Sequence, residues 1–422
     1  MRIRSLTILW ALAIQCPIFA YAGGESIVSR DSVACSIEEM WQRTLHHHLL
    51  LNAKQKEVEV AKASLAQEKL WENPQISLSH NINNPVTHRY FEFNKEGQTD
   101  IQISQRIYIA GQRGERIRMA SEEMSRAQYG QLDAERLMRK ELSGQMVQLF
   151  TLQQKVDVVQ KEVLSMDTIL QAYEEQKAKG NVSSIEIMRI SGLRLQLLQE
   201  KAELMADITR LQQSIRLMGG LDAQTVIVPK IDYAANAAML EKIQLSTMKR
   251  ELSGRSDIRT DEHEVKSAEH HVKLQKANAL PEINLTGEWD KNGSIGRNFF
   301  AFGVTFSLPV LNRNQGNIRA ARASLNSKRL LLDWNLRQAH SEMETAWEKL
   351  QMDLAIVKEA EKHQGMESDR MLEEVQAQYM KRNISLLELT DYYQTYKNTH
   401  FLMMDSQKDV LIGMAEMGIN IQ

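Results

Sequence analysis

The sequence of 422 residues is poor in cysteine and proline, with two cysteines and six prolines. Cys16 lies in an N-terminal segment that we expect to be removed, which leaves Cys35 as the single thiol. An exported protein with one cysteine has no internal disulfide framework. No proline lies within 86–228 or 310–422, and proline costs about 3 kcal/mol in a helix interior. These two stretches are therefore free to form very long helices.

Long apolar runs and an excess of one charge are also missing. The formal net charge is −2, which argues against nucleic acid as a partner, because nucleic acid favours a basic face. Residues 1–22 combine Arg2 and Arg4 with an apolar stretch and a small-residue cleavage site ending at Ala22, a pattern typical of a signal peptide. No later segment supplies the about 20 apolar residues that a transmembrane helix needs. We therefore expect export without a membrane-spanning helix.

The sequence also lacks the patterns of an enzyme, a cofactor site or a metal site. It contains no nucleophile–base set, phosphate-binding loop or ligand cluster. Histidines are adjacent at 46–48 and 270–271, and neighbouring side chains on a helix point about 100° apart. His263 and Glu264 begin an H-E-x-x-H pattern, but Ser267 occupies its last position. We expect surface or packing roles for these histidines, with no catalysis, no cofactor and no bound metal.

Two landmarks of the sequence occur twice at almost equal spacing. The motif at 73–78 (NPQISL) returns at 280–285 (LPEINL), and the motif at 181–187 (NVSSIEI) returns at 383–389 (NISLLEL). A unit of roughly 200 residues is too long for a solenoid repeat and indicates one fold element built twice. After the signal peptide we therefore predict three regions: a first repeat at 23–218, an inter-repeat segment at 219–235 and a second repeat at 236–422.

Apolar residues in the proline-free stretches follow the heptad spacing of coiled coils. They include Leu149, Leu152, Val156, Val159, Val163, Met166, Leu170 and Tyr173 in the first repeat, and Trp347, Leu350, Leu354 and Val357 in the second. This spacing predicts helices that pack lengthwise. Methionines share these positions, so we interpret them as core residues, with a copper relay as the alternative.

The same periodicity sets the lengths of the predicted helices. They span 37–71, 114–178 and 184–218 in the first repeat, and 236–279, 316–380 and 385–417 in the second. The helix over 114–178 would be on the order of 100 Å long, and the two shorter helices stacked end to end would match it. Such a helix needs neighbours along its whole length.

Two short segments separate the paired helices. They are Gly180, Asn181, Val182 and Ser183 in the first repeat, and Arg382, Asn383, Ile384 and Ser385 in the second. Glycine and asparagine tolerate the left-handed conformation that ends a helix. We therefore predict that each segment is the tip of a helical hairpin.

Four segments alternate apolar and polar residues with period two. Their apolar members are Ile76, Leu78 and Ile82; Ile101, Ile103, Ile107 and Ile109; Ile283 and Leu285; and Phe300, Phe302, Val304, Phe306 and Leu308. We predict two strands per repeat, joined by polar linkers at 84–99 and 290–298, and a further strand at 225–228. One apolar face fits either a sheet on a soluble core or lipid-facing barrel strands. Four strands cannot close a barrel, whose minimum is about eight, so membrane entry would require several chains.

This arrangement resembles the TolC-type outer membrane factors, the exit ducts of Gram-negative efflux and secretion systems. The resemblance covers nearly all of the mature chain and rests on the duplication, the two tips, and the motifs at 255–258 (RSDI) and 307–310 (SLPV). The family often has a proline where Ser256 stands, and also where Arg106 ends the second strand of the first repeat. The segment 107–113 (IYIAGQR) is similar to the cobalt–zinc–cadmium branch, which favours metal-ion export and metal resistance.

The resemblance implies a mainly α-helical protein with a small β part. Three identical chains would form one β-barrel in outer membrane lipid, continued by an α-helical tunnel through the periplasm. The tips would contact a periplasmic adaptor (membrane fusion protein), which links the duct indirectly to an inner-membrane pump of the RND type. Three alternatives remain: a duct for multidrug efflux or type I secretion, a periplasmic coiled-coil adaptor, and a secreted coiled-coil scaffold.

The resemblance also implies a constriction near the second tip. The matching residues are Tyr379 before the turn, and Glu388 and Asp391 after it. The two acids are three residues apart and share one helix face, so three chains would form a ring of carboxylates. Such rings favour cations, and mutual repulsion raises the pKa of some members. The alternative is that both are solvated charges near a helix N-terminus, where acids are favoured anyway.

Overall fold

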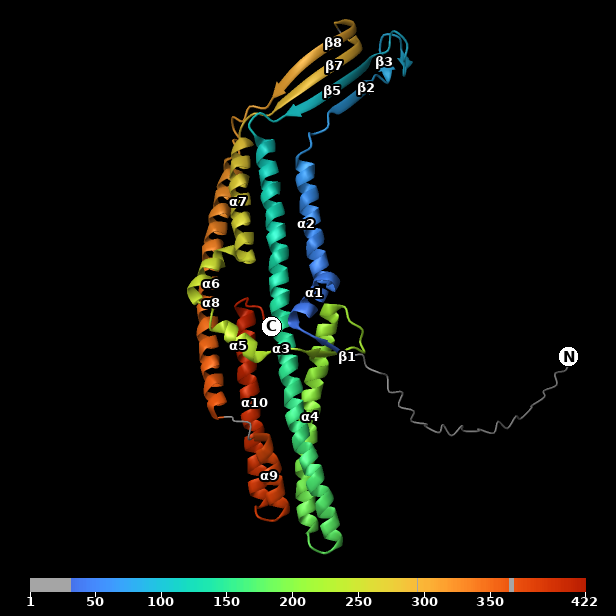
Figure 1. Cartoon of the computed structure of the whole chain (residues 1–422). Helices are drawn as coiled ribbons and strands as arrows, with labels where there is room; N and C mark the ends of the chain where they lie inside the picture. The colour runs from blue at the N-terminus through green and yellow to red at the C-terminus, as the bar shows by residue number, and fades with distance from the viewer. Residues whose placement is uncertain (1–31, 294, 364–367) are drawn as a thin grey trace, which may run out of the picture.

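The computed structural model describes residues 32–293, 295–363 and 368–422. The predicted signal peptide at 1–22, which contains Cys16, lies outside the described residues. The chain is elongated, with a β-sheet at one end and two helical hairpin tips at the other (Figure 1). It is mainly helical with a small β part, as predicted.

Helix α3 (Gln112–Ala178) runs between the sheet and the first tip (Figure 1). Its 67 residues correspond to about 100 Å. Helices α1 (Ile37–His47) and α2 (Leu49–Glu68) lie beside the half of α3 near the sheet, and α4 (Ser184–Gly219) lies beside the half near the tip. The predicted long helix and the end-to-end arrangement of its shorter partners are confirmed.

The second repeat follows the same plan. Helices α7 (Ser256–Ala277) and α10 (Leu386–Glu416) both contact α8 (Gln315–His363), and α9 (Ser368–Met380) continues towards the second tip. Helix α10 also contacts α3, which joins the two repeats. The region predicted as one helix over 316–380 is described as α8 and α9, and the residues between them lie outside the description.

Two predicted helices are interrupted. The helix predicted over 37–71 is divided into α1 and α2 because His48 has an extended backbone (φ −75°, ψ 115°). In the region predicted as a helix over 236–279, three short elements precede α7: α5 (Tyr233–Leu240), α6 (Leu245–Glu251) and a 3-10 turn (Leu252–Gly254). The break lets Leu252 and Ile258 bury against Ala339 of α8, so tertiary burial outweighs local helix propensity.

The sheet contains four antiparallel strands in the order β2-β5-β7-β8. They are β2 (Gln75–His80), β5 (Thr99–Ile107), β7 (Ile283–Gly293) and β8 (Gly296–Phe306). Ile82, Ile109 and Leu308, which we assigned to strands, lie just beyond them. Within the described residues, no helix is both long and apolar enough to cross a membrane.

The two linkers between strands differ. The first contains a small hairpin of β3 (Asn83–Asn84) and β4 (Arg89–Tyr90). The second predicted linker, over 290–298, is wrong because β7 and β8 continue through most of it and Gly293 pairs with Gly296. Asn292 likewise pairs with Arg297, so both strands stay paired almost to the reversal.

A short segment of sheet lies outside the helical layer at mid-length. Strand β6 (Val226–Pro229), which confirms the strand predicted between the repeats, pairs in parallel with β1 (Ser32–Cys35). Strand β1 carries no clear signal in the sequence and was missed. Further along, the buried side chain of Asn236 donates to the backbone oxygen of Gln422 (2.9 Å). These contacts form a belt around the middle of the molecule (Figure 1).

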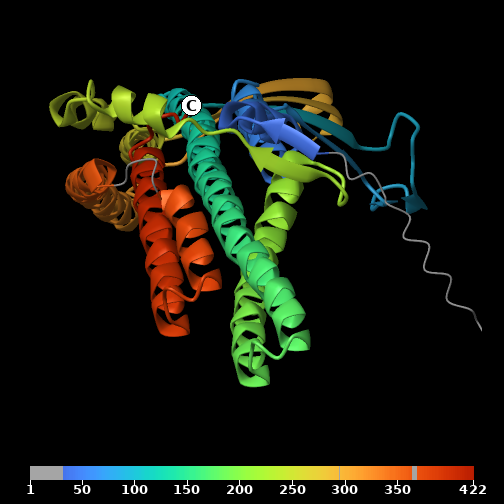
Figure 2. The ribbon, with the colours of Figure 1, turned by 60° about the horizontal axis from the view of Figure 1, so that its bottom comes forward.

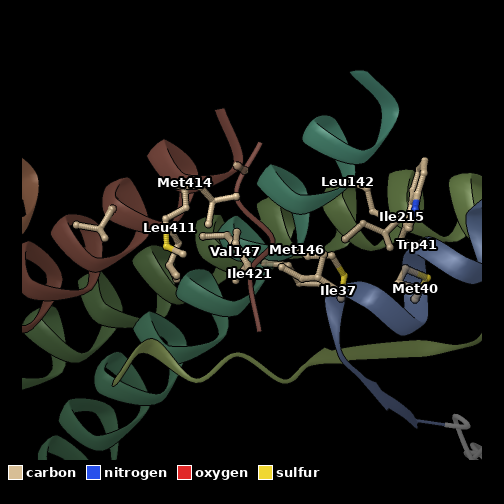
Figure 3. Packing of buried hydrophobic residues seen from close by; sticks show 14 of the residues in the cluster. Ile37, Met40, Trp41, Leu142, Met146, Val147, Ile215, Leu411, Met414 and Ile421 are labelled. Carbon is tan, nitrogen blue, oxygen red and sulfur yellow. The ribbon is translucent and has the colours of Figure 1, made fainter. Parts of the chain in front are cut away.

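The largest buried cluster lies at the same level, where α1, α3, α4 and α10 meet (Figure 3). Leu142, Met146 and Val147 of α3 are completely buried there, together with Ile215 of α4 and Met414 of α10. Burying a side chain of this size contributes about 1.5–3 kcal/mol. The two repeats are therefore joined by a hydrophobic core at mid-length, and the sheet and the tips project from it.

Candidate functional site

One face of the sheet is apolar and uncovered. Strand register places on it Ile76 and Leu78; Ile101, Ile103 and Ile107; Ile283, Leu285 and Trp289; and Phe300, Phe302, Val304 and Phe306. Phe300 and Phe302 are each 74% exposed. Of the two interpretations of this face, a sheet packed on a soluble core is therefore wrong for the single chain. The arrangement is typical of strands whose outer face meets lipid.

The opposite face of the sheet is mostly polar. It carries Gln102, Ser104 and Arg106 of β5; Asn284, Thr286 and Glu288 of β7; and Gly303 and Thr305 of β8. A Cβ atom on Gly303 would lie 2.5 Å from Oγ1 of Thr286, so any larger residue would force this threonine side chain to move. Transmembrane barrels combine an apolar outer face with a polar interior, and these strands have both.

The sheet is incomplete in one chain. Strands β2 and β8 form its edges, and within the described residues each pairs with one neighbour only. An open edge exposes unpaired backbone N–H and C=O groups, and each such group costs several kcal/mol in hydrocarbon. The sheet therefore requires further strands before it can enter a membrane.

The two predicted tips have the same local structure, and both helix reversals are confirmed. Gly180 and Arg382 occupy the equivalent left-handed positions, with φ of 77° and 61°. In each tip the following asparagine donates its backbone N–H and its side-chain amide to a glutamine five residues earlier: Asn181 to Gln176 (3.0 and 2.9 Å) and Asn383 to Gln378 (3.0 and 2.6 Å). The tips also touch, since the guanidinium of Arg382 donates to the backbone oxygen of Asn181.

Each tip continues into a capped helix. Ser183 caps α4, where its hydroxyl accepts the N–H of Ile185 (3.2 Å), and Ser385 caps α10. Val182 and Ile384 pack inwards against buried residues of the hairpins. The remaining tip residues are mostly exposed, which leaves the ends of both hairpins accessible to a partner.

Tyr379 lies between the hairpins rather than on a surface of the single chain. The hairpin interface is the contact between α3–α4 and α9–α10, and its buried hydrophobic residues are Met166, Ile169, Tyr173, Ile190, Leu372, Val375, Tyr379, Leu389 and Tyr393. The rings of Tyr173 and Tyr379 stack with centroids 5.6 Å apart. Burial raises the pKa of the Tyr379 hydroxyl, which therefore stays protonated. Figure 2 shows the two hairpins side by side.

Glu388 and Asp391 are both exposed in the first turns of α10. Glu388 closes a capping box, in which its carboxylate accepts the backbone N–H (2.7 Å) and hydroxyl (2.8 Å) of Ser385. These two bonds lower the pKa of Glu388. The increase in pKa that we expect from a carboxylate ring would require three chains, so it stays a prediction.

Polar contacts across the hairpin interface were missed by the sequence analysis. Ser165 of α3 lies 2.6 Å from Oε1 of Gln376 and 2.5 Å from the hydroxyl of Tyr393. Lys397 of α10 donates to Glu200 of α4 (2.5 Å). Ser165 lies between the apolar heptad positions Val163 and Met166, and its partners lie far away in sequence, so no local pattern identified these contacts.

Two of the histidines pair with acids of α3. Nδ1 of His263 lies 2.7 Å from Glu122, and Nδ1 of His270 lies 2.7 Å from Glu115. In the described ranges, no group of three or more histidine, cysteine, aspartate or glutamate side chains could hold a metal ion. The two histidine–glutamate pairs connect α7 to α3 along the half of the molecule near the sheet.

Solved structures share this architecture. CusC superposes with a TM-score of 0.73 at 14% identity over 90% of this chain and 91% of CusC. The CmeC outer membrane channel of Campylobacter jejuni gives 0.72 at 15% identity over 90% and 85%. The outer membrane protein VceC of Vibrio cholerae gives 0.70 at 14% identity over 92% and 97%. Identities this low support the fold alone.

Sequence comparison establishes the family. Among curated proteins, no sequence matches this chain. The model of the outer membrane efflux protein family, however, matches residues 40–221 and 247–372, which is most of the chain. These two matched ranges include the sheet, the first tip and the helices that flank them. The resemblance to TolC-type outer membrane factors is thereby confirmed, and the chain belongs to the outer membrane efflux protein family.

Proposed function

We propose that three copies of this chain assemble into an exit duct through the outer membrane, with the helices extending into the periplasm as a tunnel. The observation that carries this proposal is the sheet, which has one uncovered apolar face and two open edges. The strand order β2-β5-β7-β8 is antiparallel throughout. Strand β8 of one chain can therefore pair antiparallel with β2 of the next, and twelve strands would close one barrel.

The helices support the same assembly. Their contacts give the order α2-α3-α7-α8, which follows the order of the strands above them. The outermost helices α2 and α8 carry large exposed apolar side chains, including Leu49 and Val60 of α2 and Leu330 and Trp334 of α8. A neighbouring chain would cover these surfaces and pair α8 with α2 around a closed ring.

Purification in detergent followed by native mass spectrometry and planar bilayer recording tests the duct. We expect a trimer that forms ion-conducting pores. A stable monomer that needs no detergent and forms no pores would contradict the proposal and favour a secreted scaffold. Sedimentation with the inner membrane would instead favour a periplasmic adaptor.

The proposed partners are a periplasmic adaptor at the two tips and, through it, an RND-type inner-membrane pump. The proposed cargo is heavy-metal cations, supported by the likeness of 107–113 to the cobalt–zinc–cadmium branch. Deleting the gene should then increase sensitivity to cobalt, zinc and cadmium. Increased sensitivity to drugs alone, or loss of a secreted protein, would favour the multidrug or type I secretion alternative.

The proposed constriction is formed by Tyr379, Glu388 and Asp391. Replacing both acids (Glu388→Gln with Asp391→Asn) removes six negative charges from a trimer, and charge rings of this kind favour cations. We expect the ratio of cation to anion permeability to fall towards one in planar bilayers. Glu203→Gln, at an exposed position of α4, is the control and should leave the ratio unchanged. Unchanged selectivity in the double variant would reject the ring.

A further inference from the structure

Glu162 is a buried acid without a complete set of partners. It lies in α3 at the hairpin interface and is 1% exposed. Its Oε1 atom has no hydrogen-bond partner among the described residues. The adjacent positions Val158, Val159 and Val163 are also buried. Burying an ionised carboxylate in such surroundings is so unfavourable that the group tends to take up a proton instead.

The surroundings of Glu162 form a pocket of about 220 Å³ between α3, α4 and α10. Its other titratable groups are Glu200 of α4, and Tyr393 and Lys397 of α10. Lys397 is 9% exposed and donates to Glu200, and the Tyr393 hydroxyl lies 2.5 Å from Ser165. The positive charge of Lys397 and the negative charge of Glu200 cancel in the net charge of the pocket. The protonation state of Glu162 therefore sets the net charge of the pocket.

The pocket lies where the two hairpins meet. Its walls come from α3 and α4 on one side and α10 on the other. Among the described residues, the neutral Gln376 of α9 lies next to this pocket through its bond to Ser165. Moving α9–α10 away from α3–α4 would expose Glu162 to water and break the pair between Lys397 and Glu200. Separation of the hairpins is therefore coupled to the environment of this one carboxyl group.

We propose that Glu162 is a proton-binding residue that holds the two hairpins together when it is protonated and favours their separation when it ionises. This inference rests on the proposed function, because separation of the hairpins would widen the tip end of the duct. Its chemistry requires only a proton, taken up by the carboxylate when the interface closes and released to water when the interface opens.

The direction of the pH dependence follows from the pKa of Glu162. Burial raises this pKa from 4.5 to about 7; the charge of Lys397 lowers it and that of Glu200 raises it. In the open interface the hydrated carboxyl group would have its ordinary pKa. Protons therefore favour the closed interface, and the fraction of open interface should rise by up to about tenfold per pH unit between 4.5 and about 7. Above that range the dependence should level off.

Hydrogen–deuterium exchange on the purified full-length protein tests the proposal. Exchange of α9 and α10 is measured between about pH 5 and pH 8 and corrected for the intrinsic rate. In the wild type, we expect the corrected exchange rate of α9 and α10 to rise with pH up to about 7 and then to level off. Glu162→Gln, a neutral side chain of the same shape, should stay in the closed state at every pH. Glu174→Gln, at an exposed position of the same helix, should follow the wild type.

A second measurement keeps the test independent of how the variants fold. The infrared band of a protonated carboxyl group should disappear from the wild type as pH rises through about 7, and Glu162→Gln should lack this band. Absence of such a titration in the wild type, or wild-type pH dependence of exchange in Glu162→Gln, would overturn the proposal. Pore formation in bilayers is scored separately, so failure of the duct and failure of the proton site are distinguishable.

Discussion

Replacing Phe302 by arginine is expected to abolish stable insertion of the protein into the outer membrane. Phe302 lies on the uncovered apolar face, in the middle of β8 and opposite Gly287. Arginine on the lipid face of a barrel near the bilayer midplane costs about 2–4 kcal/mol, and a trimer would carry this cost three times. The amount of trimer recovered from the outer membrane fraction measures the effect.

Thr305→Arg is the matched control for this experiment. Thr305 belongs to the same strand but lies on the polar face, where it pairs with Asn284. Charged side chains inside a barrel change its conductance rather than its insertion. We therefore expect the control to assemble and Phe302→Arg to fail. Equal recovery of both variants would show that the apolar face does not contact lipid.

The second large effect is expected from Leu142→Ala in the mid-length core. Leu142 is completely buried where α1, α3 and α4 meet (Figure 3). Truncating a buried leucine removes transfer free energy and leaves a cavity, which together cost about 2–5 kcal/mol. The free energy of unfolding, measured by urea denaturation with circular dichroism, should fall by this amount.

Leu142→Met tests whether the loss comes from the cavity. Methionine has nearly the volume of leucine, and such exchanges usually cost less than about 1.5 kcal/mol. A large loss with alanine and a small one with methionine would identify Leu142 as part of a tightly packed core. If alanine were tolerated as well as methionine, Leu142 would not be part of the tightly packed core that joins the two repeats.

The features that were predictable from the sequence have local causes. Absence of proline and a steady heptad spacing are sufficient to specify α3, α4 and α10, since each helix buries a stripe of its own residues. Glycine at the left-handed position specifies the first tip, whereas in the second tip Arg382 takes that position and the expected asparagine follows it. Period-two alternation identified the four strands and their apolar faces, although the predicted linker at 290–298 cut β7 and β8 short.

The features that were missed depend on contacts between distant segments. His48 interrupts a helix without a proline or glycine nearby. The 3-10 turn before α7 forms because Leu252 and Ile258 find a partner in α8. Glu162 and Lys397 belong to different repeats and become neighbours only when the hairpins pack together. A local pattern contains no information about such partners.

For the candidate constriction, the sequence specified positions but not environments. Tyr379 precedes the turn and Glu388 and Asp391 follow it, as the helix pattern requires. The stacking of Tyr379 on Tyr173 depends on the packing of two hairpins. The Ser385–Glu388 capping box was visible as an S-x-x-E pattern, and it shows that one acid of the predicted ring also stabilises the start of α10.

The parallel pairing of β1 with β6 has a consequence for the order of events during folding. The chain delivers β1 first, but its partner β6 follows only after α1 to α4 have emerged. Contacts between segments so far apart in sequence form slowly, because a long loop must close first. We therefore expect the thiol of Cys35, which ends β1 and is buried in the finished fold, to remain accessible until β6 pairs with β1.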